Sequence, residues 1–206
     1  MSTSTLRFLQ QENTRLKEEN DSLREENLAM RGYMSALQEL NWATQQIISE
    51  QNLFDLLDKI LFSALNVLRA DDGSLLLLDE ETNELVFVLV HGDIGQELRG
   101  YRIGSDVGIA GWVTTHRQPL IVNNPRQDWR FSEQVDVGFE FQTRSILAVP
   151  MIARGRLVGV IELVNKRDDE GFAEADSTLL SILSIVAATA LEEMQSRLEA
   201  EEAAAG

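Results

Sequence analysis

Leucines recur every seven residues at the start of the chain and predict a coiled coil. One phase of the repeat holds Leu9, Leu16, Leu23, Met30 and Leu37, and the companion phase holds Asn13, Asn20 and Asn27. A repeat of this length is typical of a coiled-coil seam, with leucine at the d positions and asparagine at the a positions. This combination favours two parallel strands, because each buried Asn bonds its twin only when the helices are in register.

The charges beside this seam predict the same pairing. Glutamates occupy the g positions and basic residues occupy the e positions five residues later, as Glu12 and Lys17 or Glu19 and Arg24 do. A parallel dimer places each Glu against a base, whereas an antiparallel dimer places like charges together, and each contact contributes about 0.2–0.5 kcal/mol. A charged helix exposed on all sides does not explain the repeat. A DNA-gripping zipper would need a basic run upstream, where only Arg7 stands.

After the coiled coil, the spacing of apolar residues predicts one further helix and then a series of strands. A broad apolar face predicts a helix over residues 42–69. Apolar runs bounded by turn residues predict strands at 73–79, 84–92, 101–103, 119–124, 145–152 and 157–164. Helices are predicted at 108–117, within 125–139 and over 173–202. Hairpins of strands with helices at both chain ends indicate an α+β fold, an antiparallel sheet packed against helices.

Composition and charge exclude several classes of function. The formal net charge of -16 repels phosphate backbones and anionic membranes, so no nucleic-acid or membrane partner is expected. Because the chain has no cysteine, it lacks disulfides, thiolate catalysis and Cys-based zinc sites. No basic start precedes an apolar core, and the apolar runs are too short to span a bilayer. We therefore expect a cytoplasmic protein.

The segment from Leu157 to Asp176 is the most informative part of the chain. A β-branched apolar run ends in Asn165-Lys166, and a polar loop then leads through Phe172 to Asp176 at the start of a long helix. Lys166 and Asp176 carry opposite charges and flank one short connection, which predicts an ion pair between them. If exposed, such a pair contributes about 0–1 kcal/mol, so it biases a closing loop without holding it alone.

The order of motifs resembles a GAF domain. The motifs are GSLLLLD, GIAGWV, RFSEQVD, TRSILAVP, VGVIELVNK and F-x-x-x-D, over about residues 40–195. They are most similar to the sub-group found in regulatory halves of cyclic-nucleotide phosphodiesterases and bacterial adenylyl cyclases. The resemblance implies a non-catalytic sensor with a six-stranded antiparallel sheet that carries a ligand under its helices. The domain organisation becomes a coiled coil at 1–40, a GAF domain at 41–195 and a helix end and tail at 196–206.

The resemblance also implies a set of binding residues. Backbone N–H groups of Ile109 and Ala110, at a helix start after Gly108, would hold the phosphate of a nucleotide. The family's polar contacts correspond to Ser74, Asp136, Thr143 and Glu162, and its lid motif corresponds to Asn165, Lys166, Phe172 and Asp176. Four positions depart from the family pattern: Val90 replaces the stacking aromatic, His91 an acid, Phe139 a threonine and Ser177 a glutamate.

Each of these residues also has a structural interpretation. Glu162 faces either the interior or solvent, and an inward, unpaired carboxylate would be costly enough to indicate a purpose. Trp112, Trp129 and Phe131 are predicted to pack rather than to stack on a ligand. His91 and His116 have no partner at metal-ligand spacing, so no metal site is expected. No nucleophile–base pair or catalytic motif is present, and no enzyme is predicted.

Two functions follow from the sequence. The first is a homodimeric sensor whose GAF domains bind a small molecule, with cAMP or cGMP as the best candidate, and whose output passes to an effector protein. The second is a ligand-independent dimerisation or interaction scaffold whose pocket has decayed or is filled by side chains. Val90 and Phe139 favour the second reading.

Overall fold

The centre of the fold is a six-stranded antiparallel sheet. The computed structural model describes residues 11–17, 19–21, 24, 50–93, 95–168 and 170–205. The strand order is β3-β2-β1-β6-β5-β4. The strands are β1 (Ala70–Asp79), β2 (Glu84–His91), β3 (Arg102–Gly104), β4 (Leu120–Val122), β5 (Ile146–Ala153) and β6 (Arg156–Lys166). The predicted α+β class and the six predicted strands are confirmed.

Two hairpins supply the four long strands, and β1 pairs with β6 to join them. The β5–β6 turn is formed by Arg154 and Gly155, whose φ angles are 48° and 81°. Positive φ at both central residues characterises the type I′ turn, whose twist matches that of the flanking strands. This turn sets the pairing as far as Ile152 and Leu157, beyond which the register of β5 against β6 shifts by one residue.

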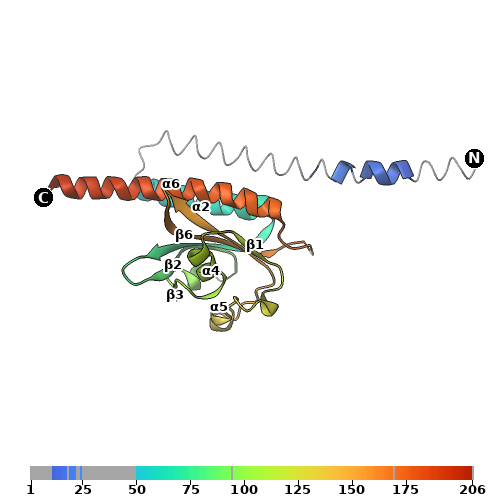
Figure 1. The fold of residues 1–206 in the computed structure, drawn as a ribbon, viewed down its shortest axis with the longest axis horizontal. Coiled ribbons are helices and arrows are strands. Elements are labelled where there is room, and N and C mark those ends of the chain that lie inside the picture. Colours follow the sequence, from blue (N-terminus) through green and yellow to red (C-terminus); the bar gives the residue numbers. More distant parts are fainter. Residues whose placement is uncertain are drawn as a thin grey trace, which may run out of the picture.

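Helices cover both faces of the sheet (Figure 1). Helices α2 (Glu50–Leu68) and α6 (Glu174–Ala205) pack side by side on one face. The other face carries α3 (Gly95–Leu98), α4 (Gly108–His116), the 3-10 turn η1 (Pro125–Gln127) and α5 (Gln134–Gly138). Since sequence-distant α2 and α6 share one face, both ends of the domain leave it on the side away from α4.

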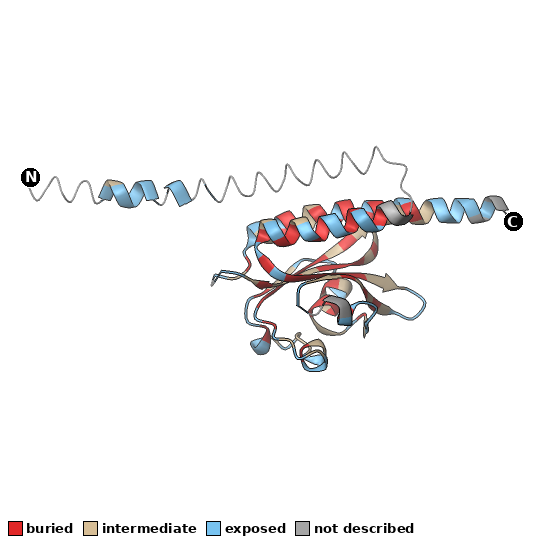
Figure 2. Cartoon of the chain, turned by 180° about the vertical axis from the view of Figure 1, so that it is seen from behind, coloured by how far each residue is buried: buried red, intermediate tan, exposed pale blue. Residues whose placement is uncertain are grey.

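Alternation along the strands divides the core into two layers. Leu75 and Ile161 are fully buried beneath α2 and α6, where the larger apolar cluster lies. Their neighbours Leu76 and Val160 are fully buried in a smaller cluster with α4. Figure 2 shows the buried stripe of α2 and α6 turned toward the sheet. The side chains of Ser74 and Glu162 share the face of Leu76 and Val160 because strand side chains alternate.

A bulge in β2 changes which of its side chains face α4. Leu75 pairs with Leu89 and Leu76 pairs with Phe87, so Val88 is the extra residue on its strand. A bulge of this kind shifts the alternation by one position. Phe87 and Val90, three residues apart, therefore both lie on the same face of the sheet, where they line one cavity.

Part of the predicted seam falls on described residues. Asn13, Leu16 and Asn20 lie in the helical stretches 11–17 and 19–21, and Leu16 is 51% exposed in the single chain. Arg15 pairs with Glu12 at 2.6 Å and with Glu19 at 3.4 Å along the same helix. Leu9, Leu23, Asn27, Met30 and Leu37 lie outside the described residues, as does the predicted start of the second helix. The parallel pairing of two chains stays a prediction.

Two sequence predictions about elements need correction. The short helix α3 was not predicted. Among the described residues, the segment Glu174–Glu201 contains an 18-residue window that is long and apolar enough by length and composition to cross a membrane, with a mean hydropathy of 1.4. Of this window, 56% is buried inside the fold, as expected of a helix that packs in a core. The helix itself was predicted over residues 173–202, but its apolar character was underestimated because small and polar residues interrupt the apolar runs.

Candidate functional site

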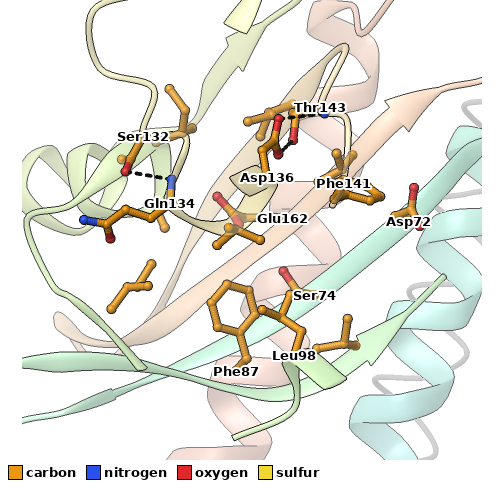
Figure 3. Close-up of a pocket in the computed structure, with 18 of the residues that line it drawn as sticks. Asp72, Ser74, Phe87, Leu98, Ser132, Gln134, Asp136, Phe141, Thr143 and Glu162 are labelled. Carbon is orange, nitrogen blue, oxygen red and sulfur yellow. Dashed lines mark hydrogen bonds between the residues drawn. The ribbon is translucent and has the colours of Figure 1, made fainter. Parts of the chain in front are cut away.

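A cavity lies between the sheet and the α4–α5 layer (Figure 3). Its volume is about 90 Å³, and its walls come from β1, β2, β6, the start of α4 and the segment from residue 131 to residue 143. Most of the lining is apolar and includes Phe87 and Leu98. The six residues predicted to bind a ligand all line it: Ser74, Ile109, Ala110, Asp136, Thr143 and Glu162. Their contact with a ligand stays a prediction.

Glu162 is the polar group at the centre of this cavity. It sits on β6 directly opposite Ser74 of β1 and Ala148 of β5. The accessible part of the side chain faces the cavity, and no hydrogen bond from any described residue reaches its carboxyl group. Burial raises the pKa of Glu162 to about 7 because the charged form is poorly solvated there. The register therefore answers the orientation question that the sequence left open, since the carboxyl group points inward.

Asp136 and Thr143 bond to each other across the roof of the cavity. The Thr143 hydroxyl donates to Asp136 Oδ1 at 2.6 Å, and the Thr143 amide donates to Oδ2 at 3.1 Å. Arg126 donates to the same Oδ2 at 2.9 Å and to Glu133 at 2.6 Å. Asp136 is buried with both oxygens occupied. These bonds join α5 to the segment that precedes β5. Asp136 therefore fixes the position of the cavity roof, which consists of α5 and this segment.

The start of α4 presents backbone donors at the cavity wall. The first bond of the helix runs from the Gly111 amide to the Val107 carbonyl at 3.0 Å, so the preceding amides have no place in the helical ladder. Ile109 and Ala110 are each 3% exposed and line the cavity. Gly108 has a φ of 70°, which favours glycine at this position. A helix start with free amides favours an anion.

Asn165 holds the end of β6 against the roof segment. The residue is buried with a φ of 61°, a conformation that asparagine tolerates better than most residues. Its side chain accepts from the Arg144 amide at 2.7 Å, donates to the Gln142 carbonyl at 3.0 Å and donates to Asp72 at 3.4 Å. Thr143 lies between those two backbone partners. Asn165 therefore positions the cavity wall without lining the cavity.

Lys166 and Asp176 form the predicted ion pair at 2.7 Å. Their side chains are only 10% and 14% exposed, so the free-energy range for an exposed pair does not apply to them. Asp176 also accepts from the Ala173 amide at 2.9 Å, and the Lys166 ammonium lies 5.6 Å from the ring centre of buried Phe172. Neither charged residue lines the cavity. The pair joins the end of β6 to the start of α6.

The positions that depart from the family pattern lie at the cavity, beside Tyr101 and at the start of α6. Val90 lines the cavity, and Phe139 packs edge-on against Tyr101 with ring centres 5.3 Å apart. His91 lies at the rim, with Nε2 at 2.9 Å from Asp58 Oδ1 of α2. Ser177 is buried at the start of α6. His91 thus connects the cavity rim directly with α2.

Two groups at the site were not found from the sequence. Asp72 lines the cavity beside Ser74, accepts from the Asp93 amide at 3.0 Å, and has a raised pKa chiefly because of burial. Arg126 is the cation that secures Asp136. The alternation that places Ser74 inward also places Asp72 inward, and this signal was available. The pairing of Arg126 depends on loop geometry that no local pattern encodes.

The three aromatic residues that were predicted to pack do not all do so. Phe131 lines the cavity and Trp112 is partly buried, stacked on His116 with ring centres 4.0 Å apart and an angle of 11°. Trp129, predicted to pack, is 88% exposed, so that prediction was wrong. Within the described part of the chain, no group of three or more His, Asp or Glu residues is arranged to hold a metal ion.

Comparison with known proteins identifies the fold family. A family model of the GAF domain matches residues 52–191. The chain belongs to the GAF domain family. GAF domains are generally regulatory, and the cavity lies in the part of the chain that this family match covers.

Curated proteins similar to this GAF domain include cyclic-nucleotide phosphodiesterases. The probable 3',5'-cyclic phosphodiesterase pde-5 of Caenorhabditis elegans is 30% identical over 142 residues, which cover 65% of this chain and 19% of the relative. The cone cGMP-specific 3',5'-cyclic phosphodiesterase subunit alpha' of Mus musculus is 35% identical over 83 residues, 40% of this chain and 10% of the relative. The chain thus spans a fifth or less of the length of these relatives.

Solved structures show the same fold. The GAF domain of a phosphoenolpyruvate-protein phosphotransferase from Coxiella burnetii superposes with a TM-score of 0.67 at 22% identity, covering 80% of this chain and 96% of that one. A free methionine-R-sulfoxide reductase from Neisseria meningitidis gives a TM-score of 0.66 at 17% identity, covering 82% and 93%. At such identities the comparison establishes the architecture.

Proposed function

We propose that this chain is a regulatory signalling module whose GAF domain senses a small molecule in the cavity between the sheet and the α4–α5 layer. The observation that carries the proposal is the inward, unpaired Glu162 carboxyl group in a mainly apolar cavity, with the free amides at the start of α4 on the same cavity's wall. A half-buried carboxyl group without a protein partner is poorly solvated, and a ligand that hydrogen-bonds to it recovers part of that cost.

A cyclic nucleotide, cAMP or cGMP, is the ligand class that we propose. The α4 amides suit a phosphate, while Glu162 and Ser74 offer polar contacts to a base or sugar. The names of the phosphodiesterase relatives point to the same class of molecule. At about 90 Å³ the cavity has room for about six water-sized groups, less than a nucleotide needs. Binding therefore requires the cavity to widen around the nucleotide while the Asp136–Thr143 bonds stay formed.

We also propose that the module is a cytoplasmic homodimer that signals through its helices to an effector protein. Leu16, Phe62 and Ile185 are 51%, 57% and 55% exposed in the single chain, an exposure that a second copy would reduce. Because His91 joins the cavity rim to α2, movement at the rim reaches the helix that follows the predicted coiled coil.

A ligand-independent scaffold is the second candidate function. The small volume of the cavity favours it, together with the aromatic contact of Phe139 and the loss of a stacking ring at Val90. In this case the dimer alone carries the function.

Calorimetry with cAMP and cGMP separates the two candidates. We expect heat of binding from at least one nucleotide, and we expect Ser74→Ala to raise its Kd about five- to tenfold because one hydrogen bond to the ligand is lost. Asp136→Ala and Thr143→Ala should weaken binding further, because the roof loses its attachment. Thr189→Ala is the matched control, since Thr189 is exposed on α6 and bonds only its own helix. No heat from either nucleotide would support the scaffold.

Disulfide cross-linking tests the parallel dimer, and the absence of native cysteine makes the result easy to interpret. Asn20→Cys should form a covalent dimer on mild oxidation, because parallel, in-register helices place this seam residue beside its twin within the usual Cα separation of about 4–7 Å. Gln11→Cys, on the opposite side of the helix, should form no covalent dimer under the same conditions. Equal yields from the two variants, or none from Asn20→Cys, would refute the proposed pairing.

A further inference from the structure

We propose that Glu162 determines ligand specificity by exchanging a proton: its neutral form selects a ligand edge with one donor beside one acceptor, and its ionised form selects an edge with two adjacent donors. This inference rests on the proposed function and deepens it, because it states which nucleotide the cavity prefers under which condition.

Glu162 is the one carboxyl group on the described cavity wall with free oxygens. Asp136 uses both of its oxygens on Thr143 and Arg126. Asp72 uses one oxygen on the Asp93 amide and the other on Asn165. No such bond reaches Glu162 from a described residue, and Figure 3 shows its carboxyl group between Ser74 below and Asp136 above. Glu162 is therefore the one of these three carboxyl groups on which a ligand meets two oxygens that have no protein partner.

No charge on the described cavity wall compensates an ionised Glu162. The lining residues include no lysine or arginine, and Arg126 is already committed to Asp136 and Glu133. The other titratable groups on the wall are Asp72 from β1, His91 from β2 and Asp136 from α5; β5 and α4 contribute only apolar lining. Two of these three are carboxyl groups, so they oppose a further negative charge. The pKa of about 7 is raised by burial, a cost that no lining lysine or arginine offsets.

The chemistry of a carboxyl group then fixes what each form can bind. A neutral carboxyl group offers one O–H donor and one acceptor, which matches the N1 and amino group of adenine. A carboxylate offers acceptors alone, which matches the two adjacent N–H donors of guanine. The Ser74 hydroxyl, on the neighbouring strand, donates or accepts and therefore suits either edge. A rise in pH through neutrality thus shifts the preference of the cavity from adenine toward guanine.

The first experiment titrates Glu162 without any nucleotide. The side-chain carboxyl ¹³C resonances of the full chain are followed with pH, and Glu162→Gln assigns the one that disappears. We expect its midpoint near neutral pH, well above the ordinary value of about 4.3. A midpoint at the ordinary value would overturn the inference whether or not nucleotides bind.

The second experiment measures the Kd of cGMP and of cAMP at about pH 6 and about pH 8, on either side of the raised pKa. We expect the affinity ratio of cGMP to cAMP to rise about tenfold between the two conditions, and to be independent of pH and in favour of cAMP in Glu162→Gln. His91→Gln should retain the shift. A ratio that does not change, or that changes equally in Glu162→Gln, would overturn the inference. If neither nucleotide binds, both the proposed function and the nucleotide preference inferred for Glu162 would be overturned.

Discussion

Replacing Asn165 with alanine is expected to lower the free energy of unfolding by about 3–4 kcal/mol, because a buried network and a strained backbone lose their support together. The Arg144 amide and the Gln142 carbonyl each lose a partner at 3.0 Å or less. A buried polar group left without a partner costs about 1–3 kcal/mol. Alanine also tolerates the φ of 61° poorly. Urea unfolding of the two proteins measures the difference.

Asn165→Gly is the matched control for the backbone part of this effect. Glycine adopts positive φ readily but removes the same hydrogen bonds, so it should be about 1 kcal/mol more stable than Asn165→Ala. Both variants should also weaken ligand binding, since Thr143 lies between the two backbone groups that Asn165 holds. If Asn165→Ala unfolds at the same urea concentration as the natural chain, the network does not hold this corner of the fold.

The strands could be predicted from the sequence because their signal is local. Apolar runs between turn residues mark β1, β2, β5 and β6, and Arg154-Gly155 marks the turn of the second hairpin. The orientation of Glu162 could not be decided in the same way. Both faces of β6 are apolar, so alternation along this strand alone does not distinguish inside from outside. Its pairing with Ser74 and Ala148 decides it, and that pairing is long-range.

The cavity wall depends on contacts that local patterns do not encode. The bulge at Val88 shifts the alternation of β2, so Phe87 and Val90 both face the cavity although they are three residues apart. The resemblance to GAF domains placed Asp136 and Thr143 at the site, but their mutual bonds fill the oxygens of Asp136. Their role as ligand contacts stays a prediction, and the bonds between them are a structural role that sequence reasoning did not anticipate.

For the ion pair of Lys166 and Asp176, the charge pattern in the sequence predicted the contact but not its burial. Opposite charges across a short connection correctly predicted a contact, which forms at 2.7 Å. Its burial was not predicted, since it depends on Phe172 packing beneath the Lys166 ammonium. A pair with so little exposure is less screened by solvent than a surface pair but loses more hydration, so the free-energy range for an exposed pair does not describe it.

The stability of the natural chain should fall by up to about 3 kcal/mol between about pH 5 and about pH 8 through Glu162 alone. Burial raises the folded-state pKa of Glu162 to about 7, above the ordinary value of an unfolded chain. Between these two values the folded protein binds the proton and the unfolded chain does not. The contribution is therefore complete below the unfolded pKa and is lost as pH rises through the folded pKa.

Urea unfolding of the natural chain and of Glu162→Gln across this pH range isolates the effect. Gln has nearly the same shape and never ionises, so the variant should become the more stable of the two as pH rises. Asp72, whose pKa burial also raises, is present in both proteins, so its contribution cancels in the difference. A difference that stays constant from acid to alkaline pH would show that the Glu162 carboxyl group is already solvated or paired, and that the cavity wall carries no proton-dependent penalty.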